Sequence, residues 1–364
     1  MTTALAVALL PVGALVALVT AVSAVMTVVV PRATPVLLTR WVFVSVRVLF
    51  QLRSRRATSY EERDRRMAMY APFSLLTLVL TWLALVLFGY MLMYWSLGER
   101  PWGLAFALSG SSLTTLGFTA PRSLLMTALS FTEAGLGLAL LALLISYLPA
   151  IYAAFSRREA TVASLDVRAG RPPSAAAMVI RLSIIKGLDD MEVWRRWEDW
   201  FVDIEETHTT NPSLVFYRSP VPQRSWITAA GTVLDAGALL ASTVEGPRRS
   251  QVELCIRAGY LALRRIADYF AISYDADPRP DDPISITREE YEAVRRRLDT
   301  AGVPLKPDAD QAWRDFAGWR VNYDTVLLAL AGLAMAPYAP WSSDRSLRYR
   351  RQPLTRRAAR AQQR

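Results

Sequence analysis

The chain has 364 residues, is 52% hydrophobic and carries a formal net charge of +10. Since this composition is too apolar for a soluble basic protein and too charged for a protein lying wholly in a membrane, it predicts a membrane part and a water-exposed part. Cys255 is the only cysteine and His208 the only histidine, which excludes an intramolecular disulfide, a cysteine metal cluster within one chain and multi-histidine metal sites.

The first apolar segment, Ala4–Val30, contains no charged residue and is long enough to cross a bilayer. A secretory signal is the competing interpretation, but it needs a basic start and a shorter apolar core. No lysine or arginine precedes the segment. We therefore favour a retained transmembrane helix within residues 1–31.

An arginine-rich linker follows over residues 32–70. Within it, Trp41–Leu52 is apolar, is interrupted by Arg47 and is too short to cross a bilayer. Such a segment is typical of an interfacial helix lying on the membrane. A helix packed against the next membrane span is an equally good interpretation.

Two further spans, about Ala71–Trp95 and Leu124–Phe155, form a module over residues 71–158 together with the segment between them. Arg157 and Arg158 follow the last span at once and mark its exit into water. The chain is thus expected to cross the membrane three times before its charged half begins.

The distribution of arginine predicts the orientation, because cytoplasmic loops carry the excess of positive charge. The arginine-rich linker is therefore expected inside. The loop between the second and third spans carries only Glu99, Arg100 and Arg122 as charged residues and is expected outside. The result is a multi-pass protein of the cell membrane, with its amino terminus outside and its carboxyl-terminal domain in the cytoplasm.

Residues 159–341 show helical spacing of apolar residues in several segments, so we expect an all-α cytoplasmic domain. The expected helices cover Ser174–Ile185, Leu188–Glu206, Ser225–Ser242, Ser250–Ile272, Thr287–Thr300 and Asp308–Met335. Asp190, Ser250 and the pair Thr287 and Glu290, in a capping-box arrangement, are expected near helix starts.

Two apolar stretches of this domain, Trp226–Leu240 and Thr325–Met335, are too short to span a bilayer and are expected to be core helices. The basic tail, residues 342–364, has no apolar periodicity and is expected to be disordered. It either lies along anionic membrane lipid or stays in solvent, and the sequence favours neither alternative.

The segment Pro101–Pro121 is mildly apolar but too short to cross a bilayer. A half-span between two long helices is the layout of a re-entrant loop, whose irregular backbone must be buried in protein or line water. Pro101 suits the first turn of a short helix over Trp102–Ser112, whose carboxyl end directs partial negative charge onward. In the oxygen-rich stretch Thr114–Phe118, Gly117 permits the left-handed backbone that turns a carbonyl toward an ion.

The sequence LTTLGF at Leu113–Phe118, preceded by a short helix and followed by a long one, resembles the pore module of two-transmembrane potassium-channel-like proteins. The resemblance extends over about Ala71–Arg158. It implies a homotetramer around a shared axis, with potassium as the permeant monovalent cation and no cofactor besides it. It also implies an ion-selectivity filter of six residues: Thr114, Thr115, Leu116, Gly117, Phe118 and Thr119.

The chain departs from the family pattern at the end of this filter. Thr119 and Ala120 stand where the family has glycine and aspartate. Because a β-branched residue is unfavourable at positive φ, the outer filter sites are not expected to take the family shape. A filter with one glycine per loop is similar to the looser Trk-type transporter filters. A re-entrant hairpin that packs without conducting is the alternative.

Four residues of the third span are further candidates. Glu133 is an ionisable residue at membrane depth, which is a functional hypothesis by default. It faces a cavity or accepts hydrogen bonds behind the filter, and we favour the supporting role. Gly135 and Gly137 permit a gating hinge or close packing. Pro149 bends the helix at an inner gate or marks the end of the span.

The soluble half shows no glycine-rich nucleotide loop and no catalytic constellation, so we expect no enzymatic activity. Asp203, Glu206 and His208 are weak metal-ligand candidates, and a solvated acidic face is the simpler interpretation. The basic helix surfaces lack the aromatic interleaving of a nucleic-acid interface, so no nucleic acid is expected as a partner.

Two functions therefore stay open from the sequence. The first is the pore subunit of a tetrameric cation channel with a cytoplasmic domain, which would bind a protein or a small-molecule regulator. The second is a non-conducting membrane anchor or sensor whose helical domain binds a protein partner.

Overall fold

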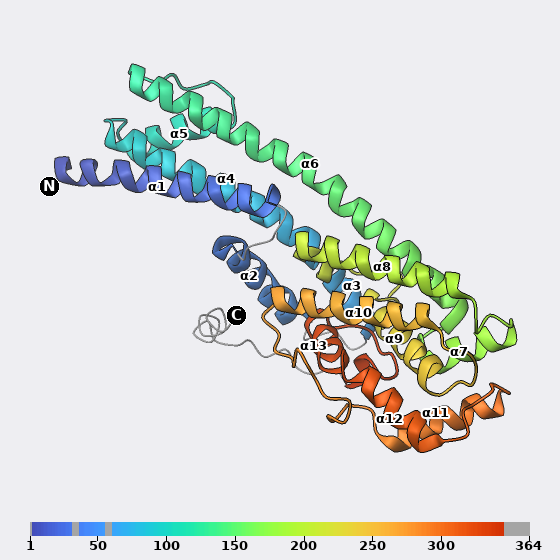
Figure 1. Ribbon diagram of the computed structural model, residues 1–364. Helices are drawn as coiled ribbons and strands as arrows, with labels where there is room; N and C mark the ends of the chain where they lie inside the picture. The colour runs from blue at the N-terminus through green and yellow to red at the C-terminus, as the bar shows by residue number, and fades with distance from the viewer. Residues whose placement is uncertain (1, 31–35, 55–59, 346–364) are drawn as a thin grey trace. The chain divides into compact units, whose positions relative to one another are not determined.

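The computed structural model describes residues 2–30, 36–54 and 60–345, and these are helical apart from turns and one isolated bridge between Val244 and Leu305 (Figure 1). The all-α expectation is confirmed. The described chain divides into two compact units, unit 1 within Met1–Ala57 and Met69–Ala153 and unit 2 within Thr58–Ala68 and Ala154–Arg364.

Unit 1 is built from long apolar helices. Its elements are α1 (Thr2–Val28), α2 (Leu37–Ser54), α4 (Tyr70–Ser96), α5 (Trp102–Leu113) and the first part of α6 (Leu124–Ala169). Three of the described helices, Ala8–Val28, Glu62–Ser96 and Leu124–Ala169, are long and apolar enough to cross a membrane. The three expected spans are thus present as helices of sufficient length and hydropathy.

Helix α1 lies along α4, and two glycines permit the close approach (Figure 1). A Cβ on Gly13 would lie 2.3 Å from the carbonyl oxygen of Gly89. Trp82, fully buried in α4, donates from Nε1 to Ser23 Oγ of α1 at 3.3 Å. Small residues let two helix backbones approach closely. Such close packing is a usual contact between helices in lipid, where the hydrophobic effect does not drive helices together.

Helix α2 packs against the start of α4. The Tyr70 hydroxyl donates to the Phe43 carbonyl at 3.1 Å, and the Phe43 and Phe50 rings both meet the Tyr70 ring edge-on. The opposite side exposes Trp41 and Leu49. Of the two interpretations of this segment, packing against the next span is therefore present, and the exposed apolar side is still available to an interface.

Helix α6 runs without interruption from Leu124 to Ala169, so the helix continues beyond Phe155, where the membrane span is expected to end. Pro149 lies inside the helix and does not end it. Because proline has no N–H, the carbonyl of Ile145 lacks its usual donor four residues on. The helix continues because Val162, Leu165 and Ala169 are buried in the core of unit 2.

Unit 2 surrounds the buried helix α9. Its elements are α3 (Tyr60–Ala68), the end of α6, α7 (Ala175–Ile184), α8 (Met191–Thr210), η1 (Pro212–Phe216), α9 (Trp226–Ser242), α10 (Ser250–Tyr269), α11 (Arg288–Thr300), α12 (Ala309–Arg320), α13 (Asp324–Ala334) and η2 (Ser343–Arg345). Almost every residue of α9 is buried, and α13 is similar, as expected for core helices. The short helix α3, from the expected linker, groups with this unit.

The helix starts follow local capping chemistry. Asp190 accepts from the Glu192 amide at 3.1 Å, and Thr287 forms the expected capping box with Glu290. Ser250 is the first residue of α10 and not its cap. The expected helix Asp308–Met335 is two helices, because the chain turns between Arg320 and Asp324.

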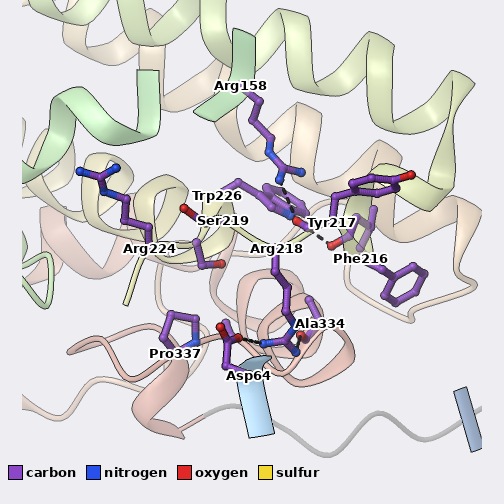
Figure 2. Close-up of a pocket in the computed structure, with 13 residues that line it drawn as sticks. Asp64, Arg158, Phe216, Tyr217, Arg218, Ser219, Arg224, Trp226, Ala334 and Pro337 are labelled. Carbon is purple, nitrogen blue, oxygen red and sulfur yellow. Dashed lines mark hydrogen bonds and ion pairs between the residues drawn. The ribbon is translucent and has the colours of Figure 1, made fainter. Parts of the chain in front are cut away.

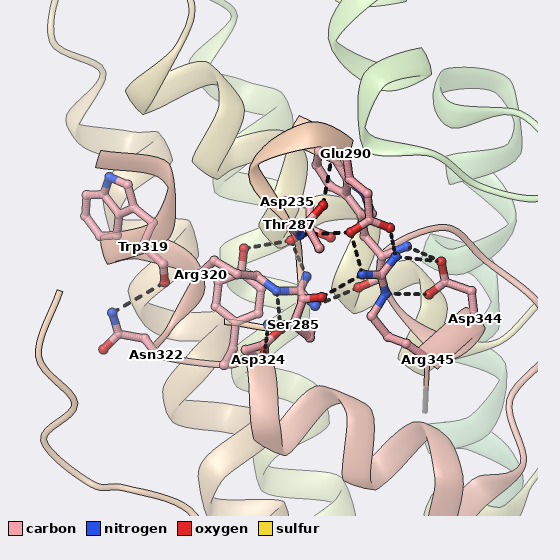
Figure 3. Close-up of polar contacts among 12 residues, drawn as sticks. Asp235, Ser285, Thr287, Glu290, Trp319, Arg320, Asn322, Asp324, Asp344 and Arg345 are labelled. Carbon is pink, nitrogen blue, oxygen red and sulfur yellow. Dashed lines mark hydrogen bonds and ion pairs between the residues drawn. The ribbon is translucent and has the colours of Figure 1, made fainter. Parts of the chain in front are cut away.

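A buried charge cluster holds α9, α12 and α13 together (Figure 3). Arg320, with no exposed surface, donates to Asp235 at 2.5 Å, to Asp324 at 2.7 Å and to the Trp341 carbonyl at 2.6 Å. Tyr323 also donates to Asp235, at 2.9 Å. Burial raises the pKa of Asp235 above its usual value, while Arg320 opposes that shift.

The start of the expected disordered tail is ordered. Ser342 is buried, and Arg345 pairs with Glu290 at 2.7 Å and donates to the Ser285 carbonyl at 2.7 Å. Residues 342–345 therefore belong to unit 2, because they complete the polar contacts around α11. The remainder of the tail lies outside the described residues.

The buried cluster gives a stability prediction. Arg320→Met would leave Asp235 and Asp324 buried without their cation, at a cost of about 3–5 kcal/mol in the free energy of unfolding. Denaturant unfolding of the detergent-solubilised chain, followed by circular dichroism, measures this. Arg279→Met is the matched control, since Arg279 pairs only with acidic residues of its own exposed turn, and should change stability by less than about 0.5 kcal/mol. Equal loss in both variants would contradict the assignment.

Candidate functional site

The short helix α5 lies between the two longest apolar helices along the chain. Pro101 is its N-cap residue, in extended conformation. The Trp102 ring stacks on the Trp95 ring at the end of α4, with centroids 4.6 Å apart and planes 7° apart. The guanidinium of Arg100 lies over the Trp95 ring, with Cζ 4.4 Å from the ring centroid. These contacts fix where α5 begins.

The segment after α5 turns back on the helix end. The Leu116 and Gly117 amides both point to the Ser111 carbonyl, at 3.0 and 3.4 Å, and the Thr119 amide donates to Ser111 Oγ at 3.2 Å. Thr115 has φ of 57° and Gly117 has φ of 70°. The left-handed backbone expected at Gly117 is present. A second one at Thr115, a β-branched residue, is strained and was not expected.

The carbonyl oxygens of Thr115 through Phe118 accept no hydrogen bond from any residue that the structure describes. The side chains of this stretch are exposed as well, Leu116 by 70% and Phe118 by 66%. Carbonyls that accept no hydrogen bond within the described chain and exposed apolar side chains therefore lie together in this segment.

Glu133, a residue of α6, forms hydrogen bonds with both α5 and α4. Its side chain has no exposed surface, and it accepts from Ser109 Oγ of α5 at 2.5 Å and from the Tyr94 hydroxyl of α4 at 3.0 Å. Ser112 and Ser130 add a hydroxyl contact of 2.7 Å between α5 and α6. Within the single chain Glu133 therefore faces protein and not an open cavity.

The two glycines of α6 differ in their surroundings. A Cβ on Gly137 would lie 2.4 Å from the Leu113 carbonyl, so this residue permits the close contact of α6 with the end of α5. A Cβ on Gly135 would meet no atom within 4 Å. Whether Gly135, Gly137 or Pro149 takes part in gating stays a prediction.

The weak metal candidates do not come together. Asp203 pairs with Arg157 at 3.2 Å, Glu206 is exposed, and His208 is buried with Nε2 3.1 Å from Arg158 Nη1. Because a guanidinium only donates, that ring nitrogen accepts and has no lone pair left for a metal. No group of three or more metal-ligating side chains occurs among residues 2–30, 36–54 and 60–345.

No protein-family model, curated protein or solved structure matches this chain. What is shown is a largely helical protein with three long apolar helices.

The sequence did not indicate Tyr94 as a partner of Glu133, because an aromatic residue at a span end is also typical of the membrane interface. It also did not reveal Arg158 as a buried residue. Arg158 donates to Glu159, His208, and the carbonyls of Leu214 and Tyr217. An arginine that follows an apolar span is normally exposed to water, so the local sequence does not indicate that Arg158 is buried.

The position of Glu133 leads to a stability prediction. Glu133→Leu removes the only acceptor that the structure shows for the Tyr94 hydroxyl, which costs about 1–3 kcal/mol. Glu133→Gln keeps one acceptor oxygen and should lose less. Thermal unfolding in detergent, with the exposed Glu206→Leu as control, compares the three. A Leu variant as stable as the Gln variant would contradict the assigned contacts.

The buried histidine predicts a pH dependence of stability. Burial, reinforced by the charge of Arg158, holds the pKa of His208 well below its usual 6.5 in the folded chain. Below about pH 6.5 the histidine of the unfolded chain binds a proton that the buried histidine does not, so the free energy of unfolding falls as pH decreases. Between about pH 7 and about pH 5.5 this contributes a loss of about 1 kcal/mol. Unfolding curves of His208→Gln should lack that loss, and an unchanged pH slope would disprove it.

Proposed function

We propose that the chain is the subunit of a membrane cation pore, in which the segment Thr114–Thr119 of four copies surrounds a common axis. The observation that supports the proposal is the backbone of this segment. Thr115 and Gly117 are left-handed, and the carbonyls of Thr115 through Phe118 have no donor among the described residues. A cation that leaves water needs such oxygens in place of its hydration shell.

The handedness of the backbone supports this reading of the segment. Thr115 and Gly117 have positive φ, and Leu116 between them does not. In an extended chain successive carbonyls point to opposite sides, whereas residues of alternating handedness bring them to the same side. The helix α5 ends directly before this row, so the partial negative charge of its carboxyl end adds to the attraction for a cation.

Several copies are needed because one segment supplies oxygens from one side only. Closed rotational symmetry is the common way to complete such a ring. The exposed apolar side chains Leu116 and Phe118, together with Phe131 and Ile145 of α6, give the surface that neighbouring copies or lipid would cover. The fourfold number comes from the resemblance of LTTLGF to potassium-channel-like pore modules.

Glu133 serves in this proposal as a support of the pore segment. It holds α5 through Ser109, and α5 holds the segment through Ser111. The permeant ion is a monovalent cation of the potassium kind. Thr119 and Ala120 replace the glycine and aspartate of the family, so weak discrimination between potassium and sodium follows. The membrane orientation is the one that the arginine distribution favours, with unit 2 in the cytoplasm.

Ion flux from proteoliposomes tests the pore. Vesicles containing the purified chain should release potassium and sodium faster than empty vesicles, and native mass spectrometry should find four copies. Gly117→Ala places a Cβ at φ of 70°, which costs about 1–2 kcal/mol and should lower flux by about tenfold. Gly103→Ala, in α5 where a Cβ meets no atom within 4 Å, is the matched control and should conduct normally.

No flux above that of empty vesicles, together with a monomer or dimer by mass spectrometry, would overturn the pore. Equal flux from Gly117→Ala and Gly103→Ala would show that conduction does not depend on the proposed segment. A loss of cellular function on deleting unit 2, with ion handling untouched by Gly117→Ala, would favour the membrane anchor or sensor instead.

A further inference from the structure

The small pocket of unit 2 has no room for a ligand (Figure 2). Its free space is about 20 Å³, which is enough for a water molecule. The guanidinium groups of Arg218 and Arg224 in its lining point away from each other, and each is held by its own carboxylate, Asp64 or Asp166. The exposed surface of unit 1 is more informative about a partner.

Helix α2 exposes an apolar stripe, formed by Leu37, Trp41, Val48 and Leu52, that the pore proposal does not use. Each of these side chains is exposed by 50% or more. At 3.6 residues per turn all four fall within about 60° around the helix axis, and the exposed Leu49 lies beside them. Single exposed apolar residues need no explanation, whereas a continuous row of them indicates a contact surface.

The other side of α2 is already packed. Val46 is buried, and the rings of Phe43 and Phe50 meet Tyr70 of α4. Val46 and Val48 point about 160° apart around the axis. The apolar stripe of α2 therefore points away from α4, and the described residues of the chain leave it uncovered.

The start of α2 lies where a candidate span ends. The Thr39 hydroxyl of α2 is 2.8 Å from the hydroxyl of Thr27, in the last turn of α1. The candidate span Ala8–Val28 has 21 residues and rises about 31 Å, close to the thickness of about 30 Å of a bilayer's hydrocarbon core. With this span in a bilayer, α2 begins at the boundary between hydrocarbon and headgroups.

The contacts with α4 place the rest of α2 outside the hydrocarbon. Helices α1 and α4 are antiparallel, since Gly13 lies against Gly89 and the later residue Ser23 meets the earlier Trp82. Helix α1 ends five residues after Ser23, whereas α4 extends twelve residues from Trp82 back to Tyr70. Tyr70, which α2 contacts, thus lies beyond the end of α1 and next to the headgroup layer.

The charge of α2 is complementary to an anionic membrane surface. The helix contains Arg40, Arg47 and Arg53 and no acidic residue. Around the axis these arginines lie about 90–130° from the middle of the apolar stripe, with Arg40 and Arg47 on one side of it and Arg53 on the other. An apolar row that includes a tryptophan such as Trp41, flanked by basic residues, is typical of a helix held at headgroup level.

We propose that the apolar stripe of α2 binds the membrane surface beside the spans, with the arginines directed to the headgroups of anionic phospholipid. A second copy of the chain on the same stripe would bring two sets of like charges together, which disfavours that partner. Binding requires that the chain lies in a membrane, but it does not require ion conduction. The proposed orientation assigns α2 to the cytoplasmic leaflet, which is the anionic one.

A spin label in the stripe identifies what covers it. Ser45 is exposed and lies about 50° from the middle of the stripe, so Ser45→Cys reports on this face and keeps every apolar residue. Cys255→Ala removes the only other thiol, which is buried. In nanodiscs of phosphatidylcholine and phosphatidylglycerol, the label on the full chain should collide more with oxygen, which concentrates in lipid, than with a water-soluble nickel complex. A label at Asp281→Cys, in an exposed turn of unit 2, is the matched control and should show the reverse.

Nickel access at residue 45 equal to that at residue 281 overturns the proposal, because the stripe then faces water. Low access of both reagents means that protein covers the stripe, and spin–spin broadening between labels assigns that protein to a second copy. Either result overturns the lipid partner. If lipid covers the stripe but no vesicle shows flux, the membrane contact stands and the pore fails.

The charge of the lipid is tested with the same label. The ratio of oxygen to nickel collisions at residue 45 should increase when phosphatidylglycerol replaces part of the phosphatidylcholine, and sodium chloride should reduce this increase. Arg40→Gln should remove about a third of the increase, because three arginines near the surface contribute similar amounts. Arg40→Lys keeps the charge and should keep the increase, which guards against misfolding of the Gln variant. Arg279→Gln, in the exposed turn of unit 2, is the control. A ratio that depends on neither lipid charge nor salt overturns the role given to the arginines.

Discussion

Helix α6 carries two charged side chains with almost no exposed surface, Glu133 in unit 1 and Arg158 in unit 2, and each organises the segment packed against it. A buried charge is tolerated only where hydrogen bonds satisfy it. Glu133 meets this condition by binding Ser109 and Tyr94, which positions α5. Arg158 meets it through the carbonyls of Leu214 and Tyr217, which positions η1 and the loop beyond it. One continuous helix thus positions α5 in unit 1 and η1 in unit 2.

Much of the fold was predictable from local signals. Apolar periodicity located the long helices, and capping residues such as Asp190 and Thr287 located helix starts. Periodicity did not predict the helix ends that depend on contacts or turns beyond the local apolar pattern. It gave no sign that the helix continues beyond the expected span end at Phe155, where Val162 and Leu165 are buried in the core of unit 2. It also joined α12 to α13, since both helices present apolar faces and only the backbone turn between them separates the two.

The candidate site was predictable in part. The order of short helix, oxygen-rich segment and long helix followed from composition, as did the left-handed Gly117. The left-handed Thr115 did not, because a β-branched residue argues against that conformation. The weak metal candidates Asp203, Glu206 and His208 do not converge, since Asp203 contacts Arg157 and His208 contacts Arg158. Arg218 and Asp64 are 154 residues apart, and no spacing rule predicts such a pair.

The length of α6 bears on the lipid around it. From Leu124 to its first basic residue, Arg157, the helix rises about 50 Å, at 1.5 Å per residue. The hydrocarbon core of a bilayer is about 30 Å thick. Even a strong tilt leaves several apolar residues before Arg157 outside hydrocarbon, and Ile145 and Tyr152 are exposed in the single chain. Such hydrophobic mismatch is relieved by a thicker bilayer or by contact with other helices. In a bilayer, a helix of this length would make the protein sensitive to the length of the lipid acyl chains.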